Sequence, residues 1–455
     1  MTTDWIDRLT ETTGQIASAA WGIPSIVLLV GTGIYLTLRM RFIQFRGFRH
    51  GLALITGRYD HLADPGEVTH FQALSTALSA TIGTGNIAGV ATAIAFGGPG
   101  AVFWMWITAL VGMATKYTSC TLALKFRQFH PDGSVSGGPM YTLAEGLGLR
   151  WLGILFALFA LIASFGIGNM VQANSVVDGL TYIVPAAGQY KLMIGVVIAI
   201  LVGLVIIGGI RRIARIASRI VPLMALLYCG AALWILVTNL EKLPSAFATI
   251  FELALNPWAA GGGAIGAAIQ YGVARGVFSN EAGLGSAPMA HAAARTGEPV
   301  REGLVAMMGP FIDTIVICTM TALVIVVSGL WGEARPEALK GAALSAHAFQ
   351  AHLGVAGSWV VGIGLVFFAY STIIAWSYYG DRSAEFLFGP GAVLPYRIIY
   401  TVLVVVGAYV PLNLVWNLAD IANILMAAPN LISLVLLAGL VKRLTDDYFQ
   451  RHPGV

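Results

Sequence analysis

Charged residues are scarce in this chain. Asp, Glu, Lys and Arg together make up 11% of its 455 residues, whereas 57% are hydrophobic. A soluble domain carries about 25% charged residues, so this composition excludes a soluble globular protein. The length then suits one bundle of membrane-spanning helices of about 20 residues each, rather than several soluble domains.

Cysteine is also scarce, and common catalytic motifs are missing. Cys120, Cys229 and Cys318 lie in apolar stretches at no metal-ligand spacing, so we expect buried small side chains and no disulfide framework. The sequence has no His-Glu-x-x-His, Gly-x-Ser-x-Gly or ATP-binding P-loop motif. We therefore expect neither an enzyme nor an ATP-driven pump, and no cofactor other than a coupling ion.

The chain is instead rich in long apolar runs. These runs predict an all-α polytopic membrane protein with about eleven transmembrane helices. The expected spans are 15–38, 70–97, 98–124, 151–177, 190–210, 216–238, 263–294, 303–330, 357–380, 396–412 and 416–441. The first fourteen residues lack the basic start of a cleavable signal peptide, so we expect the first span to remain in the mature protein.

The basic residues predict the orientation of these spans. Most of the 26 lysines and arginines fall in alternate loops on one side, as in Arg211, Arg212, Arg215 and Arg219. Loops rich in Lys and Arg stay in the cytoplasm. We therefore expect a multi-pass protein of the cell inner or plasma membrane, with its N-terminus outside and its C-terminus cytoplasmic.

Two of the apolar spans contain polar, glycine-rich interruptions. The first is Thr81–Asn86, inside span 70–97, and the second is Gly276–Gly283, inside span 263–294. Irregular backbone at membrane depth survives only where protein buries it or where it lines a cavity. Paired interruptions in two halves of a chain indicate the substrate site of a secondary transporter.

The positions of the breaks predict an inverted repeat. Span one stands alone, and spans two to six and seven to eleven form two sets of five, each beginning with a broken span. An odd number of spans per set gives the sets opposite orientations. We expect a single transmembrane domain over 1–455. It comprises an extra N-terminal span and cytoplasmic loop (1–67), a first repeat (68–240) and a second repeat (262–443). We expect loop 39–67 to be either an amphipathic cytoplasmic segment that lies at the lipid headgroups or an ordinary basic loop next to the membrane.

Several stretches resemble a known family. The segment Gly97–Trp106, Gly-Gly-Pro-Gly-Ala-Val-Phe-Trp-Met-Trp, closely resembles the alanine or glycine:cation symporter family. Thr81–Gly89, Ser164–Gln172 and Phe278–Pro288 are similar to other hallmark segments of that family. The resemblance covers nearly the whole chain. It implies a leucine-transporter-type fold, small neutral amino acids such as alanine and glycine as substrate, and Na⁺ or H⁺ as coupling ion.

The breaks carry the chemistry that a zwitterion needs. A broken helix offers unpaired N–H groups where its second half begins and unpaired carbonyls where its first half ends. We expect the first break to hold the carboxylate, the carbonyls of Gly276, Val277 and Phe278 to face the ammonium, and Gln172 to assist. For the glycines, close helix packing is the alternative. The predicted substrate set is Ile82, Gly83, Thr84, Gly85, Asn86, Phe165, Gln172, Gly276, Val277, Phe278, Ser279 and Trp376.

Trp376 is the expected determinant of substrate size. It shares a helix face with Thr372 four residues earlier, so its indole could cap the pocket beside Ile82, Phe165 and Phe278. An indole in that place would admit alanine or glycine and exclude leucine. The alternative is an ordinary tryptophan of the helix core.

Hydroxyls in span 357–380 predict the cation site. Ser371 and Thr372 lie mid-span, and Phe368 lies one turn earlier. The resemblance implies that carbonyls of the first broken span, at Ser79 and Ile82, meet these hydroxyls around Na⁺. The alternative is that the hydroxyls only bond back to carbonyls of their own helix. The predicted Na⁺ set is Ser79, Ile82, Phe368, Ser371 and Thr372.

Four ionisable residues lie within predicted spans, where they are costly and usually functional or paired. We expect Glu281 to complement the helix dipole after the second break, and Asp313 to serve a second cation or a proton path. We expect Lys116 and Arg275 to be structural charges that pair with acids.

The sequence thus predicts a secondary active transporter that couples a cation, Na⁺ above H⁺, to uptake of small neutral amino acids by alternating access. An amino-acid-permeable channel and an H⁺-coupled symporter are the alternatives.

Overall fold

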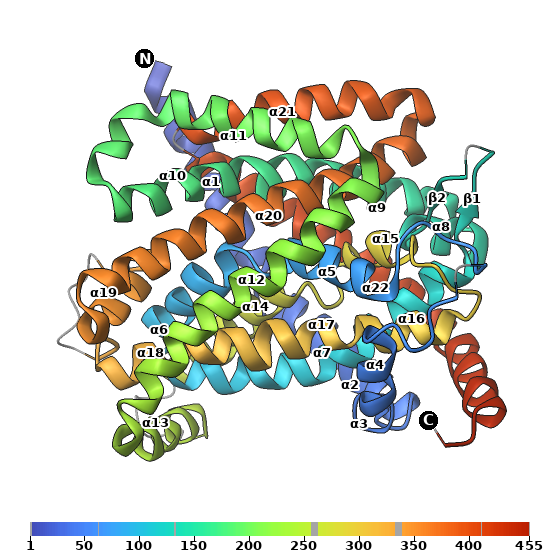
Figure 1. Cartoon of the computed structure of the whole chain (residues 1–455), viewed down its shortest axis with the longest axis horizontal. Helices are drawn as coiled ribbons and strands as arrows, with labels where there is room; N and C mark the ends of the chain where they lie inside the picture. Colours follow the sequence, from blue (N-terminus) through green and yellow to red (C-terminus); the bar gives the residue numbers. More distant parts are fainter. Residues whose placement is uncertain are drawn as a thin grey trace.

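The computed structural model describes residues 2–61, 63–131, 133–255, 263–332, 339–410 and 412–454, with side chains described outside 2–6 and 263–265. Within these ranges the chain is almost entirely helical. The long helices run along the long axis of the molecule, and the two termini lie at opposite ends of it (Figure 1).

The first half of the chain begins with four helices that precede the first broken span. Its helices are α1 (Thr2–Ala20), α2 (Ile23–Arg39), α3 (Ile43–Arg46), α4 (Phe48–Ile55), α5 (His70–Thr81), α6 (Val90–Gly97), α7 (Gly100–Lys125), α8 (Pro139–Tyr141), α9 (Arg150–Phe165), α10 (Val171–Ile183), α11 (Lys191–Ile206) and α12 (Gly209–Val237). A short antiparallel hairpin, β1 (Gln128–Phe129) and β2 (Val135–Ser136), follows α7. The sequence patterns did not predict this hairpin.

The second half repeats the helical pattern. Its helices are α13 (Leu243–Leu255), α14 (Gly263–Asn280), α15 (Ala287–His291), α16 (Pro299–Ala306), α17 (Met308–Pro310), α18 (Thr319–Ser328), α19 (Gly341–Leu353), α20 (Val355–Phe388), α21 (Val393–Tyr409) and α22 (Asn413–Arg451). Short π-helical segments, η1 (Gly85–Gly89), η2 (Thr142–Gly146), η3 (Gly166–Met170) and η6 (Phe311–Cys318), interrupt or join several spans. Tight 3₁₀ turns are η4 (Pro185–Tyr190), η5 (Leu240–Lys242) and η7 (Pro390–Ala392).

The membrane class predicted from composition is confirmed. In the described residues, eight helical runs are long and apolar enough to cross a bilayer, or nine if the bent pair His70–Thr81 and Gly85–Gly97 counts as one span. The expected spans 98–124 and 263–294 fall outside that set, although α7 and α14–α15 occupy them. The count of eleven therefore stays a prediction. All three cysteines are free, and Cys120 and Cys318 are buried as expected, whereas Cys229 is only partly buried.

The first predicted break is present. Helix α5 ends at Thr81, and the axis turns by 53° before the second half continues from Gly85. Gly83 is needed because a Cβ there would lie 2.7 Å from Thr372 Oγ1 of α20. The break therefore brings bare backbone against the central helix.

The second break lies later than expected. We predicted an interruption over Gly276–Gly283, but α14 continues to Asn280 and the irregular segment runs over 281–286. Glu281 adopts a left-handed φ of 54° at its start, and Gly283 follows with φ of 94°. Gly276 instead allows close helix packing, because a Cβ there would lie 2.5 Å from Thr108 Oγ1 of α7.

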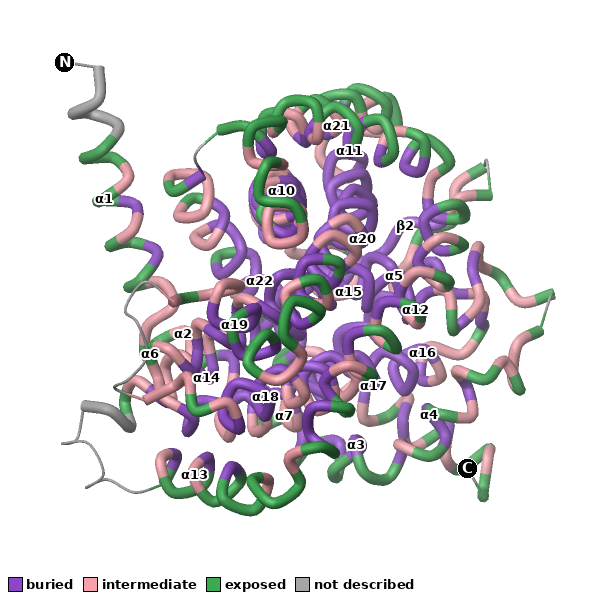
Figure 2. Tube along the Cα trace, turned by 60° about the vertical axis from the view of Figure 1, so that its left-hand side comes forward, coloured by how far each residue is buried: buried purple, intermediate pink, exposed green. Residues whose placement is uncertain are grey.

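Helix α20 forms the middle of the bundle. It packs against α5, α9, α10, α12, α19 and α21. Buried residues concentrate on α20, α5 and α15, whereas α13 is exposed along most of its length (Figure 2). The first broken span thus lies against the centre of the molecule, where neighbouring protein can satisfy its unpaired backbone groups.

A buried carboxylate joins three segments near the second break. Glu302 of α16 accepts a hydrogen bond from His291 Nδ1 at the end of α15, at 2.5 Å, and contacts His70 Nδ1 at the start of α5. All three side chains are fully buried. This cluster therefore ties the first half of one broken span to the second half of the other.

Replacing Glu302 with methionine should lower the melting temperature by several degrees in detergent. The substitution keeps the volume but leaves two buried imidazole N–H groups unpaired, at about 1–3 kcal/mol each. Thermal unfolding followed by intrinsic fluorescence measures the change. The control is Glu298→Gln, which affects the partly exposed ion pair with Arg451 and should change the melting temperature little. Equal melting temperatures for the two variants would show that the Glu302 cluster does not hold the two broken spans together.

Candidate substrate and cation site

A narrow buried cavity lies beside the first break. Its volume is about 10 Å³, which is room for about one water molecule. Residues from the first break, η3, α10, α14, α20 and α22 line it: Ala80, Thr81, Gly83, Thr84, Gly85, Ile167, Gln172, Phe278, Glu281, Thr372, Trp376 and Asn423. The two broken spans meet here, since a Cβ on Gly85 would lie 3.2 Å from Ser279 Cα.

Half of the predicted substrate residues line this cavity. They are Gly83, Thr84, Gly85, Gln172, Phe278 and Trp376. The others are placed elsewhere and are absent from its wall: Ile82, Asn86, Phe165, Gly276, Val277 and Ser279. Six of the twelve predicted substrate residues therefore share the wall of one buried cavity.

Asn86 supports the break rather than lining the cavity. Its Oδ1 accepts the Gly83 N–H at 2.9 Å, and its Nδ2 donates to Asp313 Oδ1 at 2.7 Å. Its own carbonyl accepts the Thr321 hydroxyl at 2.8 Å. Asn86 therefore fastens the unwound backbone to the segments η6 and α18.

Phe165 lies outside the cavity because η3 follows it. Its ring packs against Tyr396 and Tyr400 of α21, with ring centroids 5.2 and 6.3 Å apart. A π-helical turn shifts the face that later residues present, and Ile167 takes the place in the cavity wall. Sequence periodicity at 3.6 residues per turn could not foresee that shift.

The delayed second break moves the backbone groups expected to face an ammonium. The Val277 carbonyl accepts the Glu281 N–H at 2.8 Å, as in a continuing helix, and the Ser279 hydroxyl donates to Asp313 Oδ2 at 2.9 Å. The Val277 carbonyl is therefore already paired within the helix, while Phe278 lines the cavity.

Two side-chain acceptors point at the same space without a partner. Gln172 Oε1 and Asn423 Oδ1 are buried and have no hydrogen-bond partner within the described ranges. Gln172 Nε2 is held by the Ile167 carbonyl at 3.1 Å. Asn423 was missed, although a polar residue within the apolar run 416–441 was a usable signal. Unpaired buried acceptors are costly and suit a ligand that donates hydrogen bonds.

Trp376 forms a fixed wall of the cavity. Its indole N–H donates to Glu281 Oε1 at 3.0 Å, and Glu281 Oε2 accepts the Ser286 hydroxyl at 2.5 Å. The indole also meets the Tyr379 ring edge-on, at a centroid distance of 5.3 Å. Glu281 therefore joins the turn of the second break to the residue expected to limit substrate size.

The predicted cation ligands come together beside this cavity. The Ser371 hydroxyl lies 3.3 Å from the Ser79 carbonyl and 2.9 Å from the Phe368 carbonyl. The Thr372 hydroxyl lies 3.1 Å from the Ser79 carbonyl and 2.9 Å from the Phe368 carbonyl. The hydroxyls thus bond back within α20, as the alternative expected, and also reach across to α5.

This cluster fits the donor set of an alkali cation. Its atoms are hard oxygens from hydroxyls and from a helix that ends at the break, which is how Na⁺ is held in transporters with broken helices. The Ala80 carbonyl, 3.4 Å from Thr372 Oγ1, joins the cluster. For Ile82 the described residues record no contact with these hydroxyls, so its predicted place in the set is not supported.

Asp313 is a buried carboxylate surrounded by neutral donors. It is fully buried, and its oxygens accept from Asn86 Nδ2 at 2.7 Å, Ser279 Oγ at 2.9 Å and Thr314 Oγ1 at 2.7 Å. These donors come from both broken spans and from its own segment. A desolvated charge without a cationic hydrogen-bond partner is expensive, which points to function.

The basic residues inside the spans do not pair as expected. In the described part of the chain, neither Lys116 nor Arg275 has an ion-pair partner within 4.0 Å. Lys116 is buried at 2% exposure, and Arg275 lies over the Phe278 ring at 5.6 Å. The expected pairing of these two residues with acids is therefore not present as direct ion pairs, and their structural role stays a prediction.

Known structures show which class of fold this is. The chain is similar to the crystal structure of MhsT in complex with L-phenylalanine, with a TM-score of 0.51, 14% identity, and coverage of 82% of this chain and 89% of that one. This likeness establishes the leucine-transporter-type fold and confirms the predicted fold class.

The chain belongs to the sodium:alanine symporter family, whose model matches residues 6–454. It is 50% identical to the sodium/alanine symporter AgcS of Methanococcus maripaludis over 430 residues, covering 94% of each chain. It is 39% identical to a probable sodium/glutamine symporter, GlnT of Bacillus subtilis, over 94% of this chain and 88% of that one. The protein is therefore a multi-pass membrane transporter of a sodium and amino-acid symporter family.

Proposed function

We propose that this protein carries alanine or glycine into the cell together with Na⁺, by alternating access. Thr372 carries the proposal, because it belongs to both sites. It lines the buried cavity, and its hydroxyl contacts the Ser79 and Phe368 carbonyls of the oxygen cluster. A cation there and a substrate in the cavity would share one side chain, which gives a direct route for coupling their affinities.

The cavity supports a small zwitterion as the substrate. The backbone at Thr84 and Gly85, where the second half-helix begins, suits a carboxylate, whereas the Gly83 N–H is already taken by Asn86 Oδ1. The unpaired acceptors of Gln172 and Asn423 suit an ammonium. The indole of Trp376, fixed by its hydrogen bond to Glu281, forms part of the cavity wall and favours a short side chain over one the size of glutamine.

The remaining features concern coupling and orientation. The oxygen cluster of Ser79, Phe368, Ser371 and Thr372 would hold Na⁺, and Asp313 would balance a second cation or accept a proton. We assign the protein to the inner or plasma membrane, with its N-terminus outside and its C-terminus cytoplasmic, on the distribution of Lys and Arg between loops.

Uptake into proteoliposomes tests the function. Labelled alanine should accumulate saturably when an inward Na⁺ gradient is imposed, and unlabelled alanine or glycine should compete. Accumulation that follows only a pH gradient would replace Na⁺ with H⁺ as the coupling ion. Flux that never exceeds equilibration would indicate a channel, and no alanine flux under either gradient would overturn the proposal.

Replacing Trp376 with alanine should broaden substrate choice. Removing the indole enlarges the cavity, so uptake of leucine relative to alanine should rise about tenfold or more, as expected for a few methylenes at about 0.8 kcal/mol each. Competition by unlabelled amino acids of graded size measures the change.

The matched control for this prediction is Trp359→Ala on the same helix. Trp359 is 51% exposed and lies away from the cavity, so its loss should leave the competition profile unchanged. A Trp376→Ala profile that is identical to wild type would remove the indole from the substrate site.

A further inference from the structure

A surface cavity lies where α2 ends, next to the last helix of the chain. Its volume is about 340 Å³, and its wall is formed by Tyr35, Leu38, Arg39 and Arg41 at the end of α2 and by Lys442 of α22. Helix α2 ends there beside α3 and α4, at the end of the bundle opposite α13 and α19 (Figure 1). The volume is within the range of ligand pockets, about 300–1,000 Å³.

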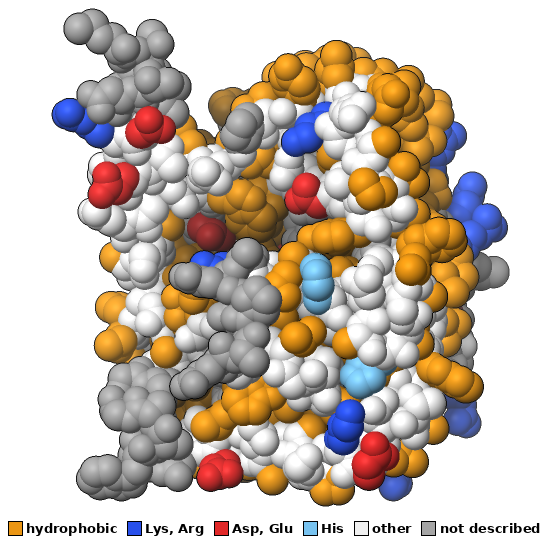
Figure 3. Space-filling view, turned by 90° about the vertical axis from the view of Figure 1, so that its left-hand side faces the viewer, with side chains coloured by type: hydrophobic (Ala, Val, Ile, Leu, Met, Phe, Trp, Pro, Cys, Tyr) orange, Lys and Arg blue, Asp and Glu red, His pale blue; other side chains and the backbone are white. Residues whose placement is uncertain are grey.

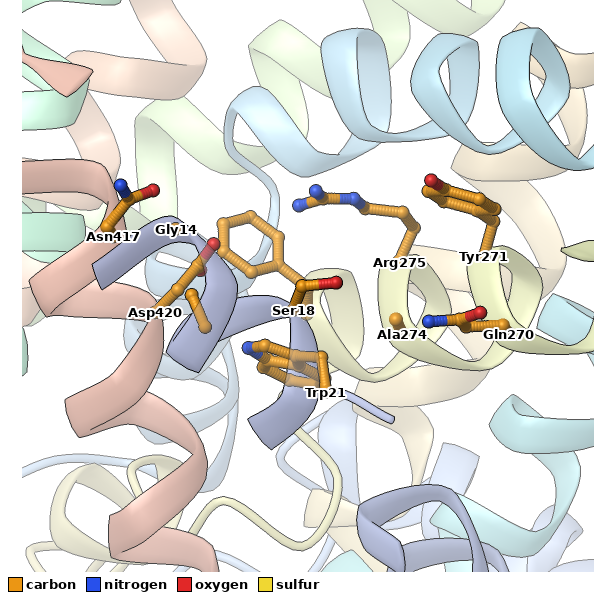
Figure 4. A pocket seen from close by; sticks show the side chains of 11 residues that line it. Gly14, Ser18, Trp21, Gln270, Tyr271, Ala274, Arg275, Asn417 and Asp420 are labelled. Atoms are coloured by element: carbon orange, nitrogen blue, oxygen red, sulfur yellow. The ribbon is translucent and has the colours of Figure 1, made fainter. Parts of the chain in front are cut away.

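This cavity is separate from the candidate substrate site. The opposite face of the bundle, which carries α13 and α19, is the hollowed one (Figure 3). Arg275 and Asp420 point into one cavity between α1, α14 and α22 (Figure 4), and Phe278 lines both that cavity and the buried one. The cavity at the end of α2 shares no residue with either of them, so it needs an explanation of its own.

Three cations line the cavity, and one of them is paired. Lys442 pairs with Asp446 at 2.5 Å, whereas Arg39 and Arg41 have no ion-pair partner within 4.0 Å among the described residues. The Arg39 side chain lies against α22, because a Cβ on Gly439 would be 3.9 Å from its Nη2. Two guanidinium groups therefore share one cavity with excess positive charge. Each can hold a phosphate in a bidentate fork.

The backbone after α2 places an arginine where glycine is usual. Arg41 and Phe42 adopt left-handed φ values of 53° and 55°, which residues with a side chain rarely do. The Phe42 N–H donates back to the Thr37 carbonyl at 2.8 Å, as in the helix ending that commonly carries glycine at the position of Arg41. Such strain persists only where the surrounding structure holds it, often at ligand sites, so it singles out Arg41 as a residue with a use.

The rest of the surroundings suits an amphiphile. Tyr35, Leu38 and Arg39 share one face of α2, and all three are exposed, so this face changes from apolar to charged toward the end of the helix. Beyond it, the exposed rings of Phe42 and Phe45 lie 6.5 Å apart. Aromatic rings and basic groups at the end of an apolar span are typical of the headgroup level of a membrane.

We propose that this cavity binds the headgroup of an anionic phospholipid. The phosphate lies on Arg39 and Arg41, and an acyl chain runs along Tyr35 and Leu38. The site goes beyond the transport function, and it joins α2, which precedes the repeats, to α22, the last helix. The orientation assigned above puts it in the cytoplasmic leaflet, whose anionic lipids attract basic segments.

The charge and the apolar wall distinguish this ligand from two others. A zwitterionic lipid brings its own cation, which would lie among the side chains of Arg39, Arg41 and Lys442. A free phosphate would use the guanidinium groups and leave the apolar face of Tyr35 and Leu38 without a partner. An anionic lipid matches both parts of the wall.

Lipid-dependent melting tests the site. In a neutral detergent, phosphatidylglycerol should raise the melting temperature by several degrees more than phosphatidylcholine with the same acyl chains, because a ligand of the folded state stabilises it. This excess should be lost in Arg39→Gln with Arg41→Gln. Arg39→Lys with Arg41→Lys keeps both charges and should keep most of the excess.

The matched control is Arg215→Gln with Arg219→Gln on α12. These two arginines are also exposed and lie on the same predicted side of the membrane, so the control loses the same charge and should keep the full excess. An equal loss in both glutamine variants would indicate general attraction to a basic surface and would overturn the site. An excess that survives loss of Arg39 and Arg41 would also overturn it.

Native mass spectrometry measures the binding directly. The dissociation constant of the tightest-bound phosphatidylglycerol should rise about thirtyfold in Arg39→Gln with Arg41→Gln, as expected for two basic residues at a membrane surface. Glycerophosphate, the soluble part of the same headgroup, should not displace this lipid at equal concentration. Displacement would replace the lipid with a free phosphate compound and overturn the proposal. Neither measurement uses transport, so this site and the proposed function are tested separately.

Discussion

Replacing Asp313 with asparagine should reduce Na⁺-driven alanine uptake about a hundredfold at low Na⁺ concentration, without lowering the melting temperature. The carboxylate is fully buried, and its hydrogen bonds come from Asn86, Ser279 and Thr314, which are all neutral. Neutralising an isolated buried charge relieves a desolvation cost. A loss of function with equal or higher stability would show that the charge serves a cation.

The size of this effect follows from charge pairing. A hundredfold loss corresponds to about 2.8 kcal/mol, just under the about 3–5 kcal/mol typical for removing one charge of a buried pair. The measurement is initial uptake against Na⁺ concentration, with thermal unfolding of the same preparation. Thr314→Val is the control, because it removes one donor and keeps the carboxylate, so uptake should fall far less. Full uptake by Asp313→Asn would make Asp313 a structural acid.

Removing both hydroxyls of the oxygen cluster should weaken Na⁺ activation by about tenfold to a hundredfold. In the double variant Ser371→Ala with Thr372→Val, the carbonyls of Ser79 and Phe368 lose the hydroxyl oxygens beside them. Each lost ligand should cost about 0.7–1.4 kcal/mol, as for a typical hydrogen bond. The Na⁺ concentration for half-maximal uptake measures this loss.

Two further variants separate cation binding from substrate binding and folding. Ser371 is absent from the wall of the inner cavity, so Ser371→Ala alone should raise the Na⁺ requirement and leave alanine competition at saturating Na⁺ unchanged. Ser377→Ala is the control on the same helix, because the Ser377 hydroxyl donates only to the Ile374 carbonyl one turn earlier. Equal Na⁺ activation of the double variant and wild type would exclude the cluster as a cation site.

The first break was predictable because its cause is local. A regular helix with two glycines and three polar side chains over Thr81–Asn86 is unfavourable in the hydrocarbon of a membrane. In the structure the span bends there by 53°. The cation cluster was predictable for a similar reason, since Ser371 and Thr372 are adjacent hydroxyls in an apolar helix. Their meeting with Ser79 came from the family resemblance rather than from the pattern.

The second break was misplaced because glycine has two uses. Gly276 read as the start of an interruption, but it lets α14 pack closely on Thr108 of α7, and the helix ends four residues later at Asn280. Which use a glycine serves depends on the neighbour that approaches it. The sequence of one helix does not contain that neighbour.

The sequence also does not tell which buried polar residues become neighbours, as three cases show: Asn423, Arg275 and Asp420. Each is polar in or near an apolar span, so the cost of burying it was visible in the residue pattern. That Asn423 shares a cavity with Gln172, and that Arg275 faces Asp420 rather than pairing with it, depends on helices brought together from distant parts of the chain.

The sequence alone determined that this chain spans a membrane, that two of its spans are interrupted, and that one interruption lies at Thr81–Asn86, because hydropathy and backbone preference act within a few turns of helix. Only the tertiary structure decided which side chains face one space. It placed Phe278 between two cavities, put Ile167 where Phe165 was expected, and set α1 against α22. Those outcomes depend on how helices approach and rotate against each other, and a π-helical turn or a close glycine contact alters both without a local signal.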